Sequence, residues 1–194
     1  MILPIRVYGD PALRTETEDV SSDSEELQQL INDMIETMRG AEGVGLAAPQ
    51  VGRTERVFVA DVTPMYEAAD ESDVPGDLEN LPPQPMVFVN PTIVWESDEA
   101  SEFEEGCLSI PDIREIVVRP LRVRITYLDQ NFEARELEVG EMLARVIQHE
   151  IDHLDGVLFV DHISAFRRRL LRRKLRDMSR GDVEADYELY TSAA

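Results

Sequence analysis

The residues of this sequence best suited to metal chemistry lie in the stretch HEIDH, which places His149, Glu150 and His153 in an HExxH pattern. Histidines four residues apart share one face of a helix, so both imidazoles can bind one metal ion, and the glutamate can act as a general base. An extended protease version of the motif continues to a third histidine, but Phe159 occupies that position here. A third ligand must therefore come from another part of the chain.

Three groups of residues are candidates for the third ligand. Glu184 and Glu188 follow the motif, as in another class of protease, but they lie in the C-terminal tail, and Asp161 and His162 come soon after it at no common spacing. The only cysteine is Cys107. A lone cysteine is most often an inert buried side chain, although its thiolate suits transition metals. Residue types alone leave this choice open.

Three short motifs occur in a fixed order along the chain. They are GVGLAAPQ (Gly43 to Gln50), EGCLS (Glu105 to Ser109) and QHEIDH (Gln148 to His153). Together they resemble the peptide deformylase family, whose pattern is a GxGxAAxQ loop, an EGCxS segment and an HExxH helix. The resemblance covers roughly residues 1–178. It implies that Cys107 is the third metal ligand, beside the two histidines.

The resemblance also implies an activity, which is removal of the formyl group from the N-terminal formylmethionine of nascent polypeptides, with release of formate. Water on a metal held by the cysteine and the two histidines would attack the formyl carbon, with Glu150 as general base and then acid. The Gln50 side chain and the Leu108 backbone N–H would stabilise the oxyanion. The implied cofactor is one divalent ion, Fe²⁺, while the ligand set is also compatible with Zn²⁺, Ni²⁺ or Co²⁺.

Further residues near the motifs are predicted to bind the substrate. Gly43 and Gly45 are expected to let a peptide backbone approach as an extended strand. Candidates for the methionine pocket and for the rest of the peptide site are Val44, Phe103, Glu105, Gly106 and Met142.

The sequence also predicts the surroundings of two arginines near the motifs. Arg145, one turn before His149, is predicted at the rim of the site, with its stem packed and its charged head in water. Glu105 and Arg114 are predicted either to form a pair that steadies the EGCLS segment or to be a solvated surface pair.

Two other classes of protein share part of this pattern. A zinc endopeptidase would use the same HExxH chemistry on internal peptide bonds, but it would need neither Cys107 nor Gln50. A non-catalytic metal-binding or redox-sensing module would use Cys107 as its reactive group, and it would not need Glu150. The complete set of motifs favours the deformylase.

Three helices are predicted among the elements that position these residues. The first runs from Ser22 to Arg39, where Ser22 and Glu25 form a capping box and apolar residues recur with helical spacing. The second runs from about Glu141 to Leu154 and carries HEIDH. The third runs from about Ser164 to Met178, with Leu170, Leu171, Leu175 and Met178 expected on one side of the helix.

Short strands are predicted between the first two helices, at residues 56–60, 86–90, 92–96, 115–120, 121–129 and 132–139. The last two are expected to form a hairpin around 129–131. Residues 61–85 combine acids and prolines and are predicted as a long surface loop. Because the strands cluster between helices, the expected fold class is α+β, with antiparallel strands packed around a central HExxH helix and with an N-terminal and a C-terminal helix.

The length of 194 residues suits one domain with a full hydrophobic core. We expect a catalytic core at about 1–163, a basic helix at about 164–178 and an acidic tail at 181–194. The net charge is −21, yet eight of the 19 basic residues lie at 164–180. The acidic body should repel free DNA, so the basic helix is a separate feature. The resemblance implies that this helix docks on the ribosome.

The sequence predicts a cytoplasmic protein that does not span a membrane, and the resemblance implies a bacterial one. No apolar run approaches ~18 residues, the length that a membrane-spanning helix needs. The start, MILPIRVYGDPALR, has neither the apolar stretch of a signal peptide nor the composition of a transit peptide. A single cysteine excludes an intrachain disulfide and fits a reducing compartment.

Overall fold

The computed structural model describes residues 1–67 and 82–191. Most of the predicted loop at 61–85 and the last three residues of the predicted acidic tail lie outside the described residues. The helical elements are η1 (Pro11–Arg14), α1 (Glu25–Gly40), η2 (Ala48–Val51), α2 (Thr63–Glu67), α3 (Glu141–Leu154), α4 (Phe159–His162) and α5 (Ala165–Met178). The strands are β1 (Ile5–Arg6), β2 (Gly45–Ala47), β3 (Val57–Ala60), β4 (Met86–Glu96), β5 (Ala100–Cys107), β6 (Ile110–Pro120), β7 (Arg122–Leu128), β8 (Ala134–Gly140) and β9 (Leu189–Tyr190).

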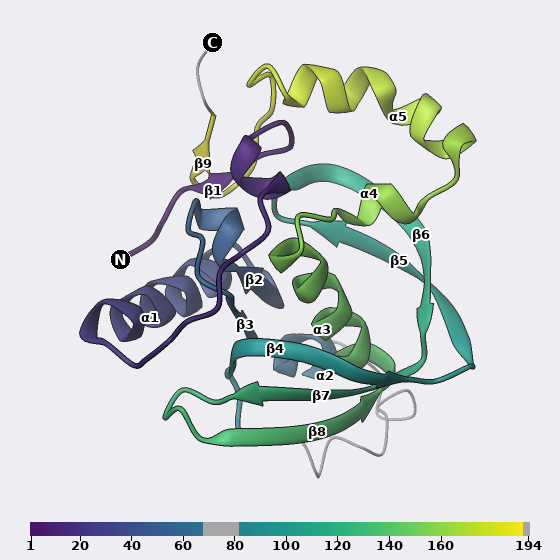
Figure 1. Cartoon of the computed structure of the whole chain (residues 1–194). Coiled ribbons are helices and arrows are strands. Elements are labelled where there is room, and N and C mark those ends of the chain that lie inside the picture. The colour runs from purple at the N-terminus through teal and green to yellow at the C-terminus, as the bar shows by residue number, and fades with distance from the viewer. Residues whose placement is uncertain (68–81, 192–194) are drawn as a thin grey trace.

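The core is an antiparallel sheet with the strand order β2-β3-β4-β7-β8. A separate hairpin of β5 and β6 lies on the other side of α3, so that this helix is enclosed by strands (Figure 1). This arrangement confirms the predicted α+β class with a central HExxH helix. Among the described residues, no helix is long and apolar enough to cross a membrane.

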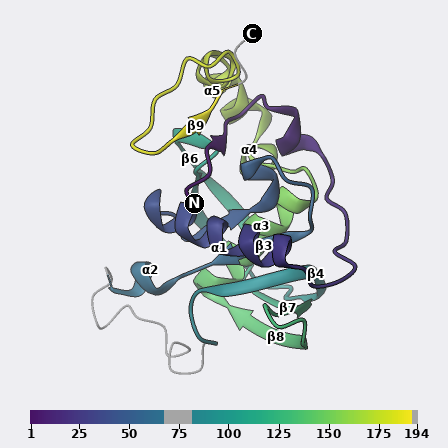
Figure 2. The same cartoon turned by 90° about the vertical axis from the view of Figure 1, so that its left-hand side faces the viewer.

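The two faces of the five-stranded sheet pack on different helices. Along β3, Phe58 belongs to the cluster that contains α3, whereas Val57 and Val59 belong to the cluster that contains α1. Successive strand residues point to opposite faces, so an apolar run such as VFVA fills both cores. The sheet therefore fixes α3 from one side while α1 covers the other face (Figure 2).

The HExxH helix has the bounds that the sequence predicts, Glu141–Leu154. Every residue from Leu143 to Ile151 is buried, because the sheet and the β5–β6 hairpin cover different sides of the helix. Burial on several sides leaves each polar residue of α3 dependent on partners from other elements.

Several predicted boundaries differ from the structure. The cap of α1 is Ser24, whose hydroxyl accepts a hydrogen bond from the Leu27 N–H, and not Ser22. The two strands predicted at 86–90 and 92–96 are one strand, β4, with irregular register beside Asn90, which has φ +50°. The glycine-rich loop contains β2 and the turn η2, and α2 was not predicted.

The C-terminal helix is anchored to the body by part of its predicted apolar stripe. Leu175 and Met178 are buried and Leu171 is half-buried, but Leu170 is 59% exposed. The prediction that Leu170 shares the buried side is wrong, because adjacent helical residues point about 100° apart and only the spacing of 171, 175 and 178 follows one face. After α5 the chain turns back, and β9 pairs with β1.

Candidate active site

Three side chains from two elements meet at the end of the β5–β6 hairpin. Cys107 is the last residue of β5, while His149 and His153 lie on α3, and their ligand atoms all lie within 4.8 Å of one another. The Cys107 Sγ is 3.2 Å from the His153 Nε2. One thiolate and two imidazoles that converge in this way fit a transition metal with one coordination position left open. The three residues fit the metal that the sequence predicts.

A buried carboxylate orients one of the two histidines. Glu105 is 5% exposed, and its Oε2 lies 2.9 Å from the Nδ1 of His149, which leaves the Nε2 of that ring for the metal. Burial opposes ionisation of Glu105, but His149 and Arg119 lower its pKa well below its usual range. The predicted pair with Arg114 is absent from the described ion pairs, since the carboxylate is bonded to Arg119. Glu105 also borders the cavity, where the sequence predicts a role in substrate binding, and its carboxylate is bonded to these partners.

The prediction for Arg145 is wrong. Its side chain is not at a wet rim but buried, with 5% of the residue exposed. The guanidinium donates to Glu105 Oε1 at 2.8 Å and to the backbone carbonyls of Val117 and Ser101 at 3.0 and 2.8 Å. The β5–β6 hairpin crosses α3 at this point and supplies these acceptors, which replace water for the charge.

Glu150 lies at the centre of the site with little solvent around it. It is 4% exposed, and its Oε2 has no hydrogen-bond partner among the described residues. Burial raises the pKa of Glu150 to about 7. A Cβ at Gly45 would collide with its Oε1, so glycine at this position of β2 lets the carboxylate sit against the strand. The carboxylate is therefore held beside the three candidate metal ligands, at a pKa that suits a group able to accept and donate a proton.

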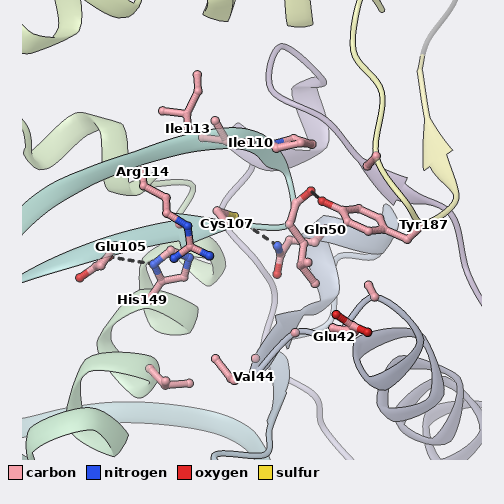
Figure 3. A pocket seen from close by; sticks show the side chains of 18 of the residues that line it. Glu42, Val44, Gln50, Glu105, Cys107, Ile110, Ile113, Arg114, His149 and Tyr187 are labelled. Atoms are coloured by element: carbon pink, nitrogen blue, oxygen red, sulfur yellow. Dashed lines mark hydrogen bonds and ion pairs between the residues drawn. The ribbon is translucent and has the colours of Figure 1, made fainter. Parts of the chain in front are cut away.

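Gln50 is fixed in the turn that follows β2. Its Oε1 accepts a hydrogen bond from the Ala47 N–H at 2.8 Å, which directs the amide nitrogen to the site. That nitrogen donates to the Ser109 hydroxyl at 3.2 Å and lies 3.5 Å from the Cys107 Sγ (Figure 3). A Cβ at Gly43 would be 2.7 Å from the side chain of Leu108, so this glycine keeps β2 close to the EGCLS segment.

A cavity of about 600 Å³ opens onto these groups. The predicted site residues that line it are Gly43, Val44, Gly45, Gln50, Phe103, Glu105, Gly106, Cys107, Leu108, Met142, His149 and Glu150. His153 lies behind them, 1% exposed. A volume of this size accepts a methionine side chain together with neighbouring peptide.

The other candidates for the third metal ligand are elsewhere. Asp161 bonds to Arg14, and the Nε2 of His162 lies 2.7 Å from Asp152. Glu184 lines the mouth of the cavity and is exposed, and Glu188 is exposed beside β9. In the described part of the chain, the cluster able to hold a metal is the one formed by Cys107 and the two histidines.

Two groups of site residues were not predicted. Arg119 bonds to Glu105 and Asp152. Its burial could have been predicted from the sequence, because Arg119 alternates with Ile113 and Val117 along the buried side of β6. The second group is the C-terminal segment around Tyr187, which also lines the cavity. No pattern in the sequence pointed to that segment.

The fold and the site together are those of a metal-dependent hydrolase class, with an HExxH helix and a cysteine placed where it could serve as a third ligand. A family model described as "Polypeptide deformylase" matches residues 2–169. The chain therefore belongs to the polypeptide deformylase family, and the prediction from the three motifs is confirmed.

Individual relatives agree with this assignment. The chain is 62% identical to a peptide deformylase of Salinibacter ruber over 191 residues, which cover 98% of this chain and 95% of the relative. It is 45% identical to that of Flavobacterium johnsoniae, over 100% and 98% of the two chains. A crystal structure of a peptide deformylase from Legionella pneumophila has a TM-score of 0.78 at 40% identity, covering 93% and 96%. A crystal structure of a peptide deformylase from Ehrlichia chaffeensis has a TM-score of 0.81 at 35% identity, and the match covers 94% of this chain and 99% of the other.

Proposed function

We propose that this enzyme hydrolyses the formyl group of N-terminal formylmethionine on nascent polypeptides in the bacterial cytoplasm and releases formate. The observation that carries the proposal is the meeting of Cys107, His149 and His153 with Glu150 at the base of one cavity. We propose one Fe²⁺ ion per chain as the resident metal, and a thiolate with two imidazoles is also compatible with Zn²⁺, Ni²⁺ or Co²⁺.

The metal, when bound, supplies Lewis acidity that makes water a nucleophile near neutral pH. Glu150 takes the proton from that water and later gives it to the departing amine, and its buried carboxylate with a free oxygen suits both transfers. Glu105 keeps His149 in the tautomer and orientation that a metal needs.

The oxyanion that forms on the formyl oxygen needs donors. The Gln50 amide nitrogen is held toward the site, and the Leu108 N–H follows the cysteine ligand directly. An amide suits this role because it donates without competing for the metal. The methionine side chain is proposed to lie between Val44 and Met142 on the wall of the cavity, with Phe103 and Gly106 beside them.

The proposed activity is tested with protein purified without oxygen and a formylmethionyl tripeptide as substrate. We expect formate to be released in proportion to bound metal, measured on the same sample. A zinc endopeptidase would instead cut internal bonds of an unformylated peptide, and a sensing module would release nothing. Either result, without formate, would contradict the proposal.

Replacing Gln50 with alanine is expected to lower kcat by about a hundredfold or more while metal content stays at the wild-type level. One oxyanion donor typically contributes that much, and Gln50 is not a predicted ligand. Steady-state kinetics with metal quantitation measure both quantities. Gln29→Ala on the exposed side of α1 is the control for loss of a glutamine amide. A Gln50→Ala enzyme with near-normal kcat would exclude the oxyanion role.

We also propose that α5 docks the enzyme on the ribosome. Arg169, Arg172 and Lys174 are exposed and form no ion pair among the described residues, so they are free to meet phosphates. Two exposed apolar side chains, Phe166 and Leu170, lie on the same helix. Arg167, by contrast, is bonded to Glu115 of the body.

Truncation after Ile163 is not a clean test of this docking. It would remove Leu175 and Met178, which are buried, together with β9. The sharper variant is Arg169→Glu/Arg172→Glu, which reverses charge on the exposed face and leaves the anchor intact.

We expect this variant to co-sediment with bacterial ribosomes at least about tenfold more weakly than the wild type, whose own binding should fall steeply with added salt. The control is Arg122→Glu/Arg135→Glu on the β7–β8 hairpin, at the opposite end of the molecule (Figures 1 and 2). Equal weakening in both variants would reflect net charge alone and would reject a docking role for α5.

A further inference from the structure

The segment after α5 folds back onto the body instead of extending into solvent. β9 pairs in parallel with β1, and the Ile5 N–H donates to the Glu188 carbonyl at 2.9 Å. The Arg6 guanidinium lies 3.4 Å from the centre of the Tyr190 ring. This segment, Gly181–Tyr190, lies outside the residues that match the family model, 2–169, so the family match assigns it no role.

Tyr187 attaches this segment to the active site. Its hydroxyl donates to the Leu108 carbonyl at 2.8 Å, one residue beyond Cys107, and Figure 3 shows its ring entering the site on the side of Gln50. Burial and the nearby Cys107 and Asp112 raise the pKa of Tyr187, so the phenol stays protonated and keeps donating. The segment is therefore held at a defined place beside the proposed oxyanion site.

Residues of the segment alternate between the body and the cavity mouth. Val183 and Leu189 pack into the apolar clusters of the body, whereas Glu184 and Asp186 are exposed and line the cavity. Neither carboxylate forms an ion pair with any described residue. The segment thus presents two unpaired negative charges to whatever enters the cleft.

The rest of the cavity mouth has the same sign of charge. Three more exposed acids line it, Glu42, Glu104 and Asp112, and each is without an ion pair in residues 1–67 and 82–191. Of the described residues that line the cavity, Arg114 is the only one that is both basic and exposed. A cleft with several charges of one sign attracts ligands of the opposite sign.

We propose that the segment Gly181–Tyr190 is a wall of the peptide-binding cleft that makes the enzyme prefer basic residues after the formylmethionine. The inference rests on the proposed function, because a polypeptide whose first residue occupies the cavity must leave through this mouth. The residues that follow the methionine then pass Glu184 and Asp186, and Tyr187 fixes the distance of the wall from the reacting centre.

The test compares two formylated peptides that differ at one residue, and therefore by two units of charge: formyl-Met-Ala-Lys and formyl-Met-Ala-Glu, both amidated at the C-terminus. At low salt we expect kcat/KM to be roughly fivefold higher for the lysine peptide, mainly because its KM is lower. A difference of this size is what attraction by two exposed carboxylates would produce. The ratio should fall toward one as KCl is raised, because salt screens exposed charges.

Two variants locate the preference in the segment. Glu184→Gln/Asp186→Asn removes both charges with little change in shape and should bring the ratio to about two or below. Glu184→Lys/Asp186→Lys should reverse the preference. The matched control is Asp182→Asn/Glu188→Gln, which removes the same charge from residues of the segment that do not line the cavity, and it should keep the wild-type ratio.

A wild-type enzyme that releases formate from both peptides at equal kcat/KM would overturn the inference and leave the proposed function standing. An equal shift of the ratio in the control variant would also overturn it, since net charge would then explain the preference. Absence of formate release from every peptide would overturn the proposed function, and the inference with it.

Discussion

Cys107→Ala is expected to lose metal and formate release together. The thiol supplies one of three ligand atoms within 4.8 Å of one another, and two imidazoles alone hold a divalent ion weakly. Metal should fall from about one equivalent per chain to a small fraction of that. Loss of the Lewis acid removes several kcal/mol of transition-state stabilisation, so the rate should fall by roughly a thousandfold or more.

The measurement is metal content and formate release on the same anaerobic sample. Chelator-treated wild-type protein is the matched control, because it lacks metal and keeps the thiol. The two proteins should be equally inactive, and added Fe²⁺ should restore only the wild type. A Cys107→Ala protein that retains a full equivalent of metal would show that the ligand assignment is wrong.

Glu150→Gln is expected to keep the metal and lose catalysis, with kcat lower by about a hundredfold to ten-thousandfold. The amide fills the same space between α3 and β2, but it cannot accept the proton from water. Glu150 is not among the three predicted ligands, so metal content should stay near that of the wild type.

Glu141→Gln is the matched control for this change, since Glu141 is an exposed glutamate at the start of the same helix. Its kinetics and metal content should match the wild type. If Glu150→Gln turned over at a near-normal rate, proton transfer would have to be assigned to another group. If it lost its metal, Glu150 would be a ligand and not a base.

The sequence by itself determined the features that depend on neighbours along the chain. The bounds of α3 agree with its apolar spacing, and HExxH spacing predicts two imidazoles on one helical face. Strand clustering between helices predicted the α+β class. The predicted ligand role of Cys107 came from its motif, since nothing local distinguishes it from an inert buried cysteine.

Only the tertiary structure decided which distant groups meet. Arg145 looked exposed because helical spacing gives the direction of a side chain but not what covers it, and the β5–β6 hairpin covers this one. The same packing gave Glu105 its partner Arg119 in place of Arg114. Tyr187 reaches Leu108 because β9 returns to pair with β1. A two-residue strand leaves no periodic signal, so long-range packing alone determines where it lies.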